Sequence, residues 1–335
     1  MSRNRFRVGT FNVYNLISPD RFYYGNRKYK PEIYEKKIRW IGAQLDCMKA
    51  NVVGFQEVWE EKALSEAIAQ SESLQGAKIV VAKEVGNSPS VAIASTLPIV
   101  GHQVIEAFPE SALLQIEGEE LALKKFSRPI LCAQIQLRKG LECTVVVAHL
   151  KSKRPDLAAG ADENDPLENA KGKVRSLIRR AAESVALRSV LLDLLKDRTH
   201  PVIAMGDLND SPGAVTTQLI SGEPPWRKLS VARKTAIWDV LMHHVKDIQA
   251  RKSYEDFYYT YIHNGHYDSL DHILVSQEFA DSNRDRIGIV ESVSVLNDHL
   301  IDETLSKDEV EAWQSDHGQV AATIELETVK KTKEK

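Results

Sequence analysis

The sequence predicts an α/β protein in which helices lie on the outer faces of paired β-sheets. Short apolar segments recur along nearly the whole chain, and many are unbroken runs of Val, Ile and Ala, as expected for strands that are covered on both faces. Helical patterns lie between some of these segments, so sheets and helices should form separate layers. The 335 residues contain no internal repeat and no linker rich in Gly, Pro or Ser, which indicates a single domain that spans residues 1–325. Residues 326–335 are expected to form a disordered basic tail.

Ten segments have the composition of strands. In chain order they are RFRVGTFNV (5–13), NVVGFQEV (51–58), AKIVVAKEV (77–85), SVAIAS (90–95), PILCAQIQL (129–137), LECTVVVAHL (141–150), PVIAMGDLN (201–209), LDHILVS (270–276), IGIVESVSVL (287–296) and GQVAATIEL (318–326).

Two segments have the periodicity of helices, one at 34–50 and a longer one at about 168–196. In the longer segment six apolar residues recur at helical spacing, and we expect this stripe to face the core while the charged face meets solvent. The stripe consists of Val174, Leu177, Ile178, Ala181, Val185 and Leu192.

Composition limits the kind of protein and its partners. With 43% hydrophobic residues and a formal net charge of −3, the chain is an ordinary globular protein that cannot hold nucleic acid through a global positive field. Cys47, Cys132 and Cys143 are too few for a disulfide framework, and two of them lie in apolar strand segments, which indicates buried free thiols. No signal-peptide pattern and no run of eighteen apolar residues is present, so a cytoplasmic location is expected.

Polar residues stand at strand ends where packing alone would favour apolar ones. In VIAMGDLNDSP, Asp207 and Asn209 would share one face of a strand, although Asp, Asn and Pro also favour a turn at this place. Five further segments also carry polar residues at or near strand ends. Each of them, taken singly, has a purely structural interpretation such as a helix cap, a core histidine or a turn. Their polar residues are Asn12, Glu57, His149, Asp271, and the pair Asp316 and His317.

Taken together and in this order, six segments resemble the endonuclease/exonuclease/phosphatase superfamily with the DNase I-like fold. They are TFNVYNL, GFQEV, AHLKSK, MGDLNDSP, LDHILVS and SDHGQV. The resemblance runs from residue 7 to about residue 325 and includes SVAIASTLPI. Similarity to the bacterial nuclease-like branch is found in HLKSK, GDLNDSP and YIHNGHYDSLDHILVS. The Trp-Thr-Asp-Arg signature of inositol-polyphosphate phosphatases is not found.

The resemblance implies a four-layer α/β/β/α sandwich of two packed mixed β-sheets flanked by helices, with the catalytic pocket at one rim. It also implies Mg2+ or Mn2+ held mainly by Glu57, with Asn12 and Asp316. Such hard cations prefer oxygen ligands and promote water attack on phosphoesters.

Five further residues take catalytic roles by the same resemblance. Asp207 and Asn209 would hold the attacking water and the phosphate, and His149 would donate to the phosphate or the leaving group. Asp271 would orient His317 as the catalytic imidazole, because a carboxylate that accepts from an imidazole fixes its tautomer.

One position departs from the pattern of the family. Some relatives have an acidic residue where this chain has Tyr14, and Asn15 is the neighbouring residue that could compensate in part. We therefore expect one metal site and leave a second open.

Three regions are candidates for other ligand contacts. A basic and aromatic loop carries Arg21, Arg27 and Lys28, and a basic stretch after His149 carries Lys151, Arg175 and Arg179; each set is either a phosphate-binding surface or a solvated one. Asn264-Gly265 predicts a hairpin with His263 and His266 as a cross-strand pair, for which an exposed tip is favoured over a metal site because no third ligand is identifiable.

The sequence thus predicts a divalent-metal-dependent phosphodiesterase, first of all a nuclease that hydrolyses DNA or RNA by metal-activated water attack. The alternative is the same chemistry on a non-polymeric phosphoester such as a phospholipid, a nucleotide messenger or a sugar phosphate. A non-catalytic binding protein on the same scaffold is disfavoured, because every catalytic position of the family is filled by a competent residue. Nucleic acid is the expected partner, and no obligate protein partner or membrane segment is evident.

Overall fold

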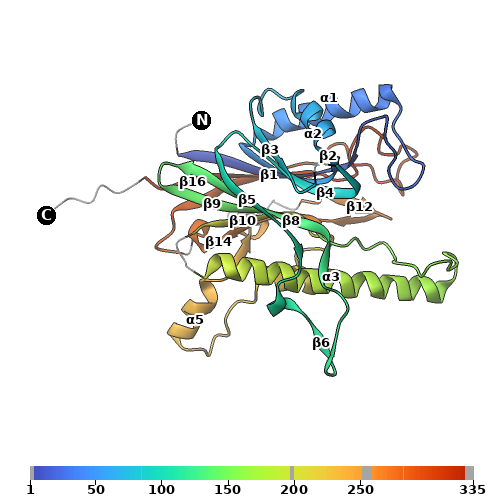
Figure 1. The fold of residues 1–335 in the computed structure, drawn as a ribbon. Coiled ribbons are helices and arrows are strands. Elements are labelled where there is room, and N and C mark those ends of the chain that lie inside the picture. The colour runs from blue at the N-terminus through green and yellow to red at the C-terminus, as the bar shows by residue number, and fades with distance from the viewer. Residues whose placement is uncertain (1–3, 84, 197–199, 251–257, 282, 329–335) are drawn as a thin grey trace.

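Two six-stranded β-sheets pack face to face, with helices on both outer sides (Figure 1). The computed structural model describes residues 4–83, 85–196, 200–250, 258–281 and 283–328. Both sheets mix parallel and antiparallel strands. The predicted four-layer α/β/β/α sandwich is therefore confirmed.

The first sheet has the strand order β15-β16-β1-β2-β4-β3. Its strands are β1 (Arg5–Leu16), β2 (Val52–Glu60), β3 (Lys78–Val81), β4 (Val85–Ser95), β15 (Gly288–Leu296) and β16 (Gln319–Leu326). The second sheet has the order β11-β14-β10-β9-β8-β5. Its strands are β5 (Ile99–Ala107), β8 (Lys125–Arg138), β9 (Leu141–His149), β10 (Val202–Asp207), β11 (Met242–His244) and β14 (Asp271–Ser276).

Helices and short hairpins complete the described fold. The helices are α1 (Pro31–Met48), α2 (Glu61–Ile68), α3 (Pro166–Leu195), α4 (Val215–Ser221), α5 (Val231–Trp238) and α6 (Val245–Ala250), with single 3-10 turns at Glu110–Ala112 and Gln277–Phe279. The hairpins are β6 (Gln115–Ile116) with β7 (Glu119–Glu120), and β12 (Tyr261–His263) with β13 (His266–Asp268). No helix among these is long and apolar enough to cross a lipid bilayer.

Three apolar layers hold the sandwich together, as the unbroken Val, Ile and Ala runs predict. The central layer lies between the sheets and includes Val147 and Ile273. A second layer joins the first sheet to α1 and α2, and a third joins the second sheet to α3. All ten predicted strands are present, whereas β5 and the short helices lack a strong pattern in the sequence.

The predicted core stripe of α3 is wrong. Val174 is 53% exposed and Leu177 is 49% exposed, and Ile178 and Leu192 are exposed as well, while Ala181 and Val185 are half-buried. α3 instead turns small and polar residues inward along much of its length, among them Arg180 and Glu183.

Those inward polar groups bind the loops that border the site. Arg180 pairs with Asp210 at 3.1 Å, and Glu183 accepts from the backbone N–H groups of Ser127 and Lys151 at 2.8 and 2.7 Å. Hydrophobic periodicity assumes that the buried face is the apolar one, and it fails where buried polar groups have partners.

The hairpin prediction and the cysteine prediction are confirmed. His263 and His266 are cross-strand partners at an exposed tip. Cys132 and Cys143 are buried free thiols, whereas Cys47 is exposed. The proposed tail at 326–335 starts with the last residue of β16, and residues 329–335 lie outside the described part of the chain.

Strand directions bring the polar strand ends to one rim. β1 runs parallel to β2, and β9 runs parallel to β10. The polar residues towards the carboxyl ends of each pair therefore lie at the same edge of their sheet. β14 is antiparallel to β10 and begins at Asp271, which is paired with Asp207. β16 is antiparallel to β1 and begins two residues after His317.

Candidate active site

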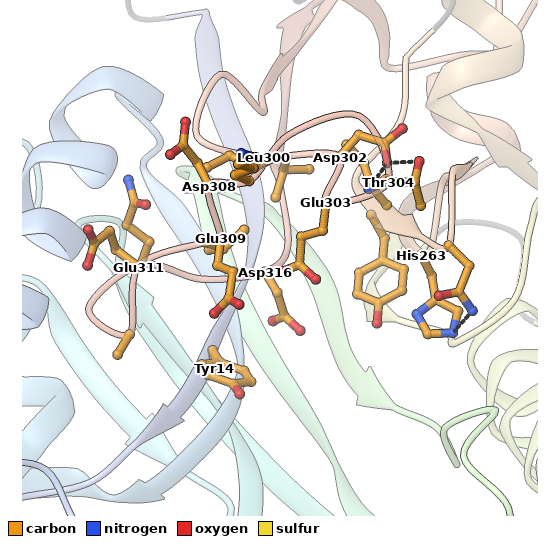
Figure 2. Close-up of a pocket in the computed structure, with 18 of the residues that line it drawn as sticks. Tyr14, His263, Leu300, Asp302, Glu303, Thr304, Asp308, Glu309, Glu311 and Asp316 are labelled. Carbon is orange, nitrogen blue, oxygen red and sulfur yellow. Dashed lines mark hydrogen bonds between the residues drawn. The ribbon is translucent and has the colours of Figure 1, made fainter.

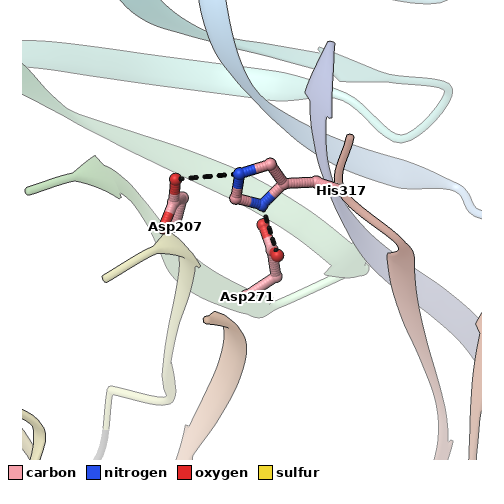
Figure 3. A group of neighbouring side chains, drawn as sticks. All are labelled: Asp207, Asp271 and His317. Carbon is pink, nitrogen blue, oxygen red and sulfur yellow. Dashed lines mark hydrogen bonds and ion pairs between the residues drawn. The ribbon is translucent and has the colours of Figure 1, made fainter. Parts of the chain in front are cut away.

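Three buried side chains form the centre of the site: Asp207, Asp271 and His317 (Figure 3). Asp271 Oδ2 lies 2.8 Å from Nδ1 of His317, and Asp207 Oδ2 lies 3.8 Å from its Nε2. The imidazole is thus held between two carboxylates contributed by adjacent, antiparallel strands. Thr260 Oγ1 accepts from the backbone N–H of Asp271 at 3.1 Å and anchors the start of β14.

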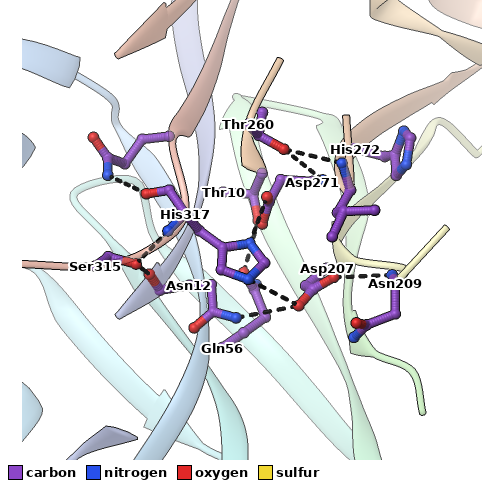
Figure 4. A network of polar contacts seen from close by, with 12 residues as sticks. Thr10, Asn12, Gln56, Asp207, Asn209, Thr260, Asp271, His272, Ser315 and His317 are labelled. Atoms are coloured by element: carbon purple, nitrogen blue, oxygen red, sulfur yellow. Dashed lines mark hydrogen bonds and ion pairs between the residues drawn. The ribbon is translucent and has the colours of Figure 1, made fainter. Parts of the chain in front are cut away.

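Asp207 is the hub of the wider polar network (Figure 4). Its Oδ2 accepts from Asn12 Nδ2 at 3.1 Å and lies 3.3 Å from Nε2 of His149. The contact with Asn12 crosses from β1 in the first sheet to β10 in the second. The network therefore joins the two sheets at the rim.

Asn209 reaches the site through a turn and not through strand alternation. β10 ends at Asp207, and Asn209 adopts a left-handed conformation with φ of 56°. Its backbone N–H donates to Asp207 Oδ1 at 2.9 Å, and its Nδ2 donates to the carbonyl of Leu150 at 3.0 Å. The prediction of a turn at this place is correct, and Asp207 and Asn209 do lie together. The two residues do not share one face of a strand, because the strand ends at Asp207.

Charge is distributed unequally among these buried groups. Burial alone would lower the pKa of His317, but Asp271 and Asp207 raise it well above its usual value. Burial would raise the pKa of Asp207, yet the imidazoles of His317 and His149 hold it well below its usual range. Burial raises the pKa of Asp271 to about 6, although His317 opposes this. Near neutral pH the site therefore contains an imidazolium beside an ionised Asp207.

His149 differs from His317 because it is neutral. Burial lowers its pKa, the nearby Arg128 lowers it further, and Asp207 compensates only in part. Its Nε2 faces Asp207, and its buried Nδ1 has no hydrogen-bond partner among the described residues. A neutral imidazole has an unprotonated ring nitrogen that can accept a proton, whereas an imidazolium can only donate one.

The predicted metal ligands lie beside this centre. Asn12 Nδ2 lies 3.4 Å from Glu57 Oε1, and the backbone N–H of Asn15 donates to Glu57 Oε2 at 3.0 Å. Glu57 has a φ of 64°, a strained conformation that occurs where β2 breaks register. Burial raises the pKa of Asp316, and Glu57 adds to this, while the buried Oδ1 of Asp316 has no hydrogen-bond partner among the described residues.

These oxygens fit a divalent cation. Two carboxylates repel one another here, and one of them has an oxygen without a hydrogen-bond partner among the described residues, which is a set of oxygen donors that suits a hard divalent cation. Asp207, Asp271 and His317 also place ligand atoms within 4.8 Å of one another, but His317 Nδ1 is already hydrogen-bonded to Asp271. Of the two groups, the oxygens on the Glu57 side are therefore the better fit to a divalent cation.

Asn15, the residue that could compensate in part for Tyr14, has its side-chain oxygen engaged by an aromatic residue. Asn15 Oδ1 accepts from the indole N–H of Trp59 at 3.0 Å, so this oxygen serves the packing of the aromatic side chain.

The predicted substrate-binding residues are mostly engaged within the protein. Arg21 pairs with Glu60 at 3.2 Å, Arg175 with Glu168 at 2.7 Å, and Arg179 lies 4.0 Å from Asp156. Lys28 lies over the ring of Phe22 at 5.4 Å, and Arg27 is exposed. Lys151 is half-buried and follows His149 by two residues.

Sequence reasoning missed Lys37, Gln56 and Arg128. Lys37 of α1 is fully buried, and its Nζ has no hydrogen-bond partner among the described residues. Gln56 accepts from Thr10 Oγ1 at 3.1 Å, and Arg128 donates to the Leu150 carbonyl at 3.2 Å. A signal for Lys37 existed, since it interrupts the apolar face that Tyr34 and Ile41 define on the helix.

Comparisons with known proteins identify the family and support the fold. The profile of the Endonuclease/Exonuclease/phosphatase family matches residues 9–317. No curated protein matches the chain. Among solved structures, truncated Caenorhabditis elegans TDP2 is 15% identical with a TM-score of 0.55, covering 96% of this chain and 98% of that chain. D. rerio TDP2 complexed with single strand DNA product is 14% identical with a TM-score of 0.53, covering 96% and 99%.

A bacterial structure is similar to the same extent. An endonuclease/exonuclease/phosphatase family protein from Bacteroides thetaiotaomicron is 13% identical with a TM-score of 0.56, covering 96% of this chain and 95% of that chain. At these identities the structures support the fold, while the family profile covers most of the sequence. The chain belongs to the endonuclease/exonuclease/phosphatase family and is a phosphoester hydrolase of a divalent-metal-dependent type.

Proposed function

We propose that this chain is a Mg2+- or Mn2+-dependent phosphodiesterase that hydrolyses nucleic-acid phosphodiester bonds. The observation that carries the proposal is the imidazole of His317 held between Asp271 and Asp207, next to the oxygens of Asn12 and Glu57. Proton-transferring groups beside oxygens that suit a divalent cation support this proposal, because phosphodiester hydrolysis uses both.

Each side chain has a distinct role. Protonated His317, oriented by Asp271, donates a hydrogen bond to a phosphate oxygen and stabilises the charge that develops there. Ionised Asp207 orients the attacking water and accepts its proton. His149 donates to the phosphate or the leaving group, and Asn209 holds the phosphate. Glu57, Asn12 and Asp316 would hold a divalent cation, which would supply Lewis-acid polarisation of the phosphate when bound.

Nucleic acid is the proposed substrate because basic residues cluster next to His149. Arg128 lies near its ring, and Lys151 and Arg154 follow in the chain. A D. rerio TDP2 structure contains single strand DNA product, which supports the same class of substrate. The internal pairing of Arg21, Arg175 and Arg179 favours a second candidate, a smaller phosphoester that touches few cations.

The test is hydrolysis of circular plasmid DNA, single-stranded RNA and bis(p-nitrophenyl) phosphate with Mg2+, Mn2+ or EDTA. We expect metal-dependent hydrolysis, which His317→Ala or Asp207→Ala lowers by about 10²–10⁴-fold without unfolding, the usual contribution of a positioned acid or base. His102→Gln, which alters an exposed histidine on β5, is the matched control. Activity that persists in EDTA or in His317→Ala would contradict the proposal. Hydrolysis of the small diester alone would favour the second candidate.

A further inference from the structure

A cavity of about 1070 Å³ opens beside the catalytic centre (Figure 2). Tyr261 lines it, and the ring of Tyr261 lies 5.0 Å from the ring of His317. Asp316, the neighbour of His317 in the chain, also lines it, as does Tyr14, which donates its backbone N–H to Asn12. Any substrate whose phosphate meets His317 would therefore extend one arm into this cavity.

The cavity is strongly acidic. Its acidic residues are Asp302, Glu303, Asp308, Glu309, Glu311 and Asp316. Lys307 is the only lysine or arginine among the described residues that line it. Figure 2 shows the carboxylates of Glu303, Glu309 and Asp316 directed into the same space near Tyr14. A second phosphate of a polynucleotide would be repelled here.

The carboxylates differ in how far the described part of the protein compensates their charge. Glu303 and Glu309 are exposed and form no ion pair within the described ranges of the chain. Asp316 is different because its Oδ1 is buried and has no hydrogen-bond partner among those residues. The proposed metal site already accounts for that oxygen, so the negative charge available to an organic cation is that of exposed side chains such as Glu303 and Glu309.

The walls add aromatic rings to this negative charge. Tyr14, Tyr23, Tyr29 and Tyr261 line the cavity, and Tyr23 stacks on Tyr29 with centroids 5.3 Å apart. Lys37 already lies over the rings of Tyr14 and Tyr29 at 5.5 and 5.4 Å, from α1. Ring faces attract cations, and tyrosines combined with carboxylates recognise alkylammonium groups.

We propose that this cavity binds a positively charged organic arm of the substrate, with an alkylammonium group as the recognised chemistry. The inference rests on the proposed function and specifies its substrate: a phosphodiester that is anionic on the side of Arg128 and Lys151 and cationic on the side of Tyr261.

The experiment compares two probes that differ only in charge. p-Nitrophenyl phosphorylcholine carries a trimethylammonium group, and p-nitrophenyl 3,3-dimethylbutyl phosphate has the same shape with carbon in place of nitrogen. Consumption is followed by 31P NMR, which reports hydrolysis whichever P–O bond breaks. We expect kcat/KM to favour the cationic probe by at least about tenfold at low salt, since charge interactions are screened as salt rises.

The acidic residues are then tested directly. The double variant Glu303→Gln and Glu309→Gln should reduce this preference towards equality, and its thermal melt should remain that of the wild type because both side chains are exposed. Glu142→Gln, at the opposite end of β9 from His149, is the matched control and should keep the preference.

The outcomes separate the two proposals. If neither probe is consumed with Mg2+ or Mn2+, the phosphodiesterase assignment fails and this inference fails with it. If both are consumed equally, or the neutral probe is preferred, the phosphodiesterase stands and the cationic subsite is wrong. A preference that survives in the double variant would also overturn the subsite, because the selectivity would then arise elsewhere.

Discussion

At the scale of single residues, Lys37 is the least expected feature of the molecule. Its ammonium is fully buried between two tyrosine rings and has no hydrogen-bond acceptor among the described residues. Burial lowers its pKa to about 7, although Asp316 and Glu57 act in the opposite direction. A buried ammonium is costly, and these two carboxylates are the groups that offset the cost.

Lys37 should weaken cation binding at the adjacent site. At pH 6, below the pKa of about 7, Lys37 is charged and repels a divalent ion. Lys37→Met removes this repulsion with little change in volume, and we expect Mn2+ to bind roughly tenfold more tightly by calorimetry, which corresponds to about 1.4 kcal/mol. Lys62→Met, on the exposed face of α2, should leave the affinity unchanged. Weaker Mn2+ binding by a folded Lys37→Met protein would refute this role.

At the scale of elements, β10 depends on a glycine at its end. Gly206 has a φ of 146°, and a Cβ built there would lie 1.9 Å from the carbonyl oxygen of Ala148 in β9. No side chain fits between the two backbones at this point. The close approach positions Asp207 opposite His149 and Asp271.

Gly206→Ala should therefore destabilise the fold by at least about 3 kcal/mol, because both the backbone conformation and the space exclude a methyl group. Urea denaturation measures the change. Gly213→Ala is the control from the following turn, where an added Cβ meets nothing within 4 Å, and it should be neutral or slightly stabilising. Equal stabilities of the two variants would show that β9 and β10 can separate without cost.

The elements also show how far sequence alone leads. The strands were predictable because Val, Ile and Ala runs have few alternatives in a sandwich, and the site residues because polar groups at strand ends stand out against them. The orientation of α3 was not predictable, since Arg180 and Glu183 are buried through partners from distant loops. Lys37 was missed because a lysine in a helix is normally exposed.

At the scale of the whole molecule, buried histidines make stability depend on pH. Burial lowers the pKa of His244 to about 4 and that of His272 to about 3, and the two rings contact each other at 5.3 Å. In the unfolded chain each imidazole takes up a proton near pH 6.5, whereas the folded protein excludes it down to these lower values. Between the two values the unfolded state binds more protons, so the stabilisation is lost as the pH falls.

Replacing one histidine should flatten this dependence. His244→Phe removes one titrating group from the pair, and its free energy of unfolding should fall less steeply than that of the wild type between pH 6.5 and 4, by up to about 1.4 kcal/mol per pH unit. Denaturation with urea at several pH values gives the two slopes. His102→Gln, an exposed position, should keep the slope of the wild type. Parallel slopes for His244→Phe and the wild type would mean that His244 is protonated in the folded protein.

The pairing of β1 with β16 has a consequence for the synthesis of the chain. The first and last strands of the described fold lie side by side, and His317 enters the site just before β16 begins. A chain that stops before residue 317 lacks both the imidazole proposed as catalytic and the strand that covers the edge of β1. Prematurely ended translation products are therefore expected to be inactive, and a cell that makes this hydrolase is exposed to its activity only once the last strand has been added.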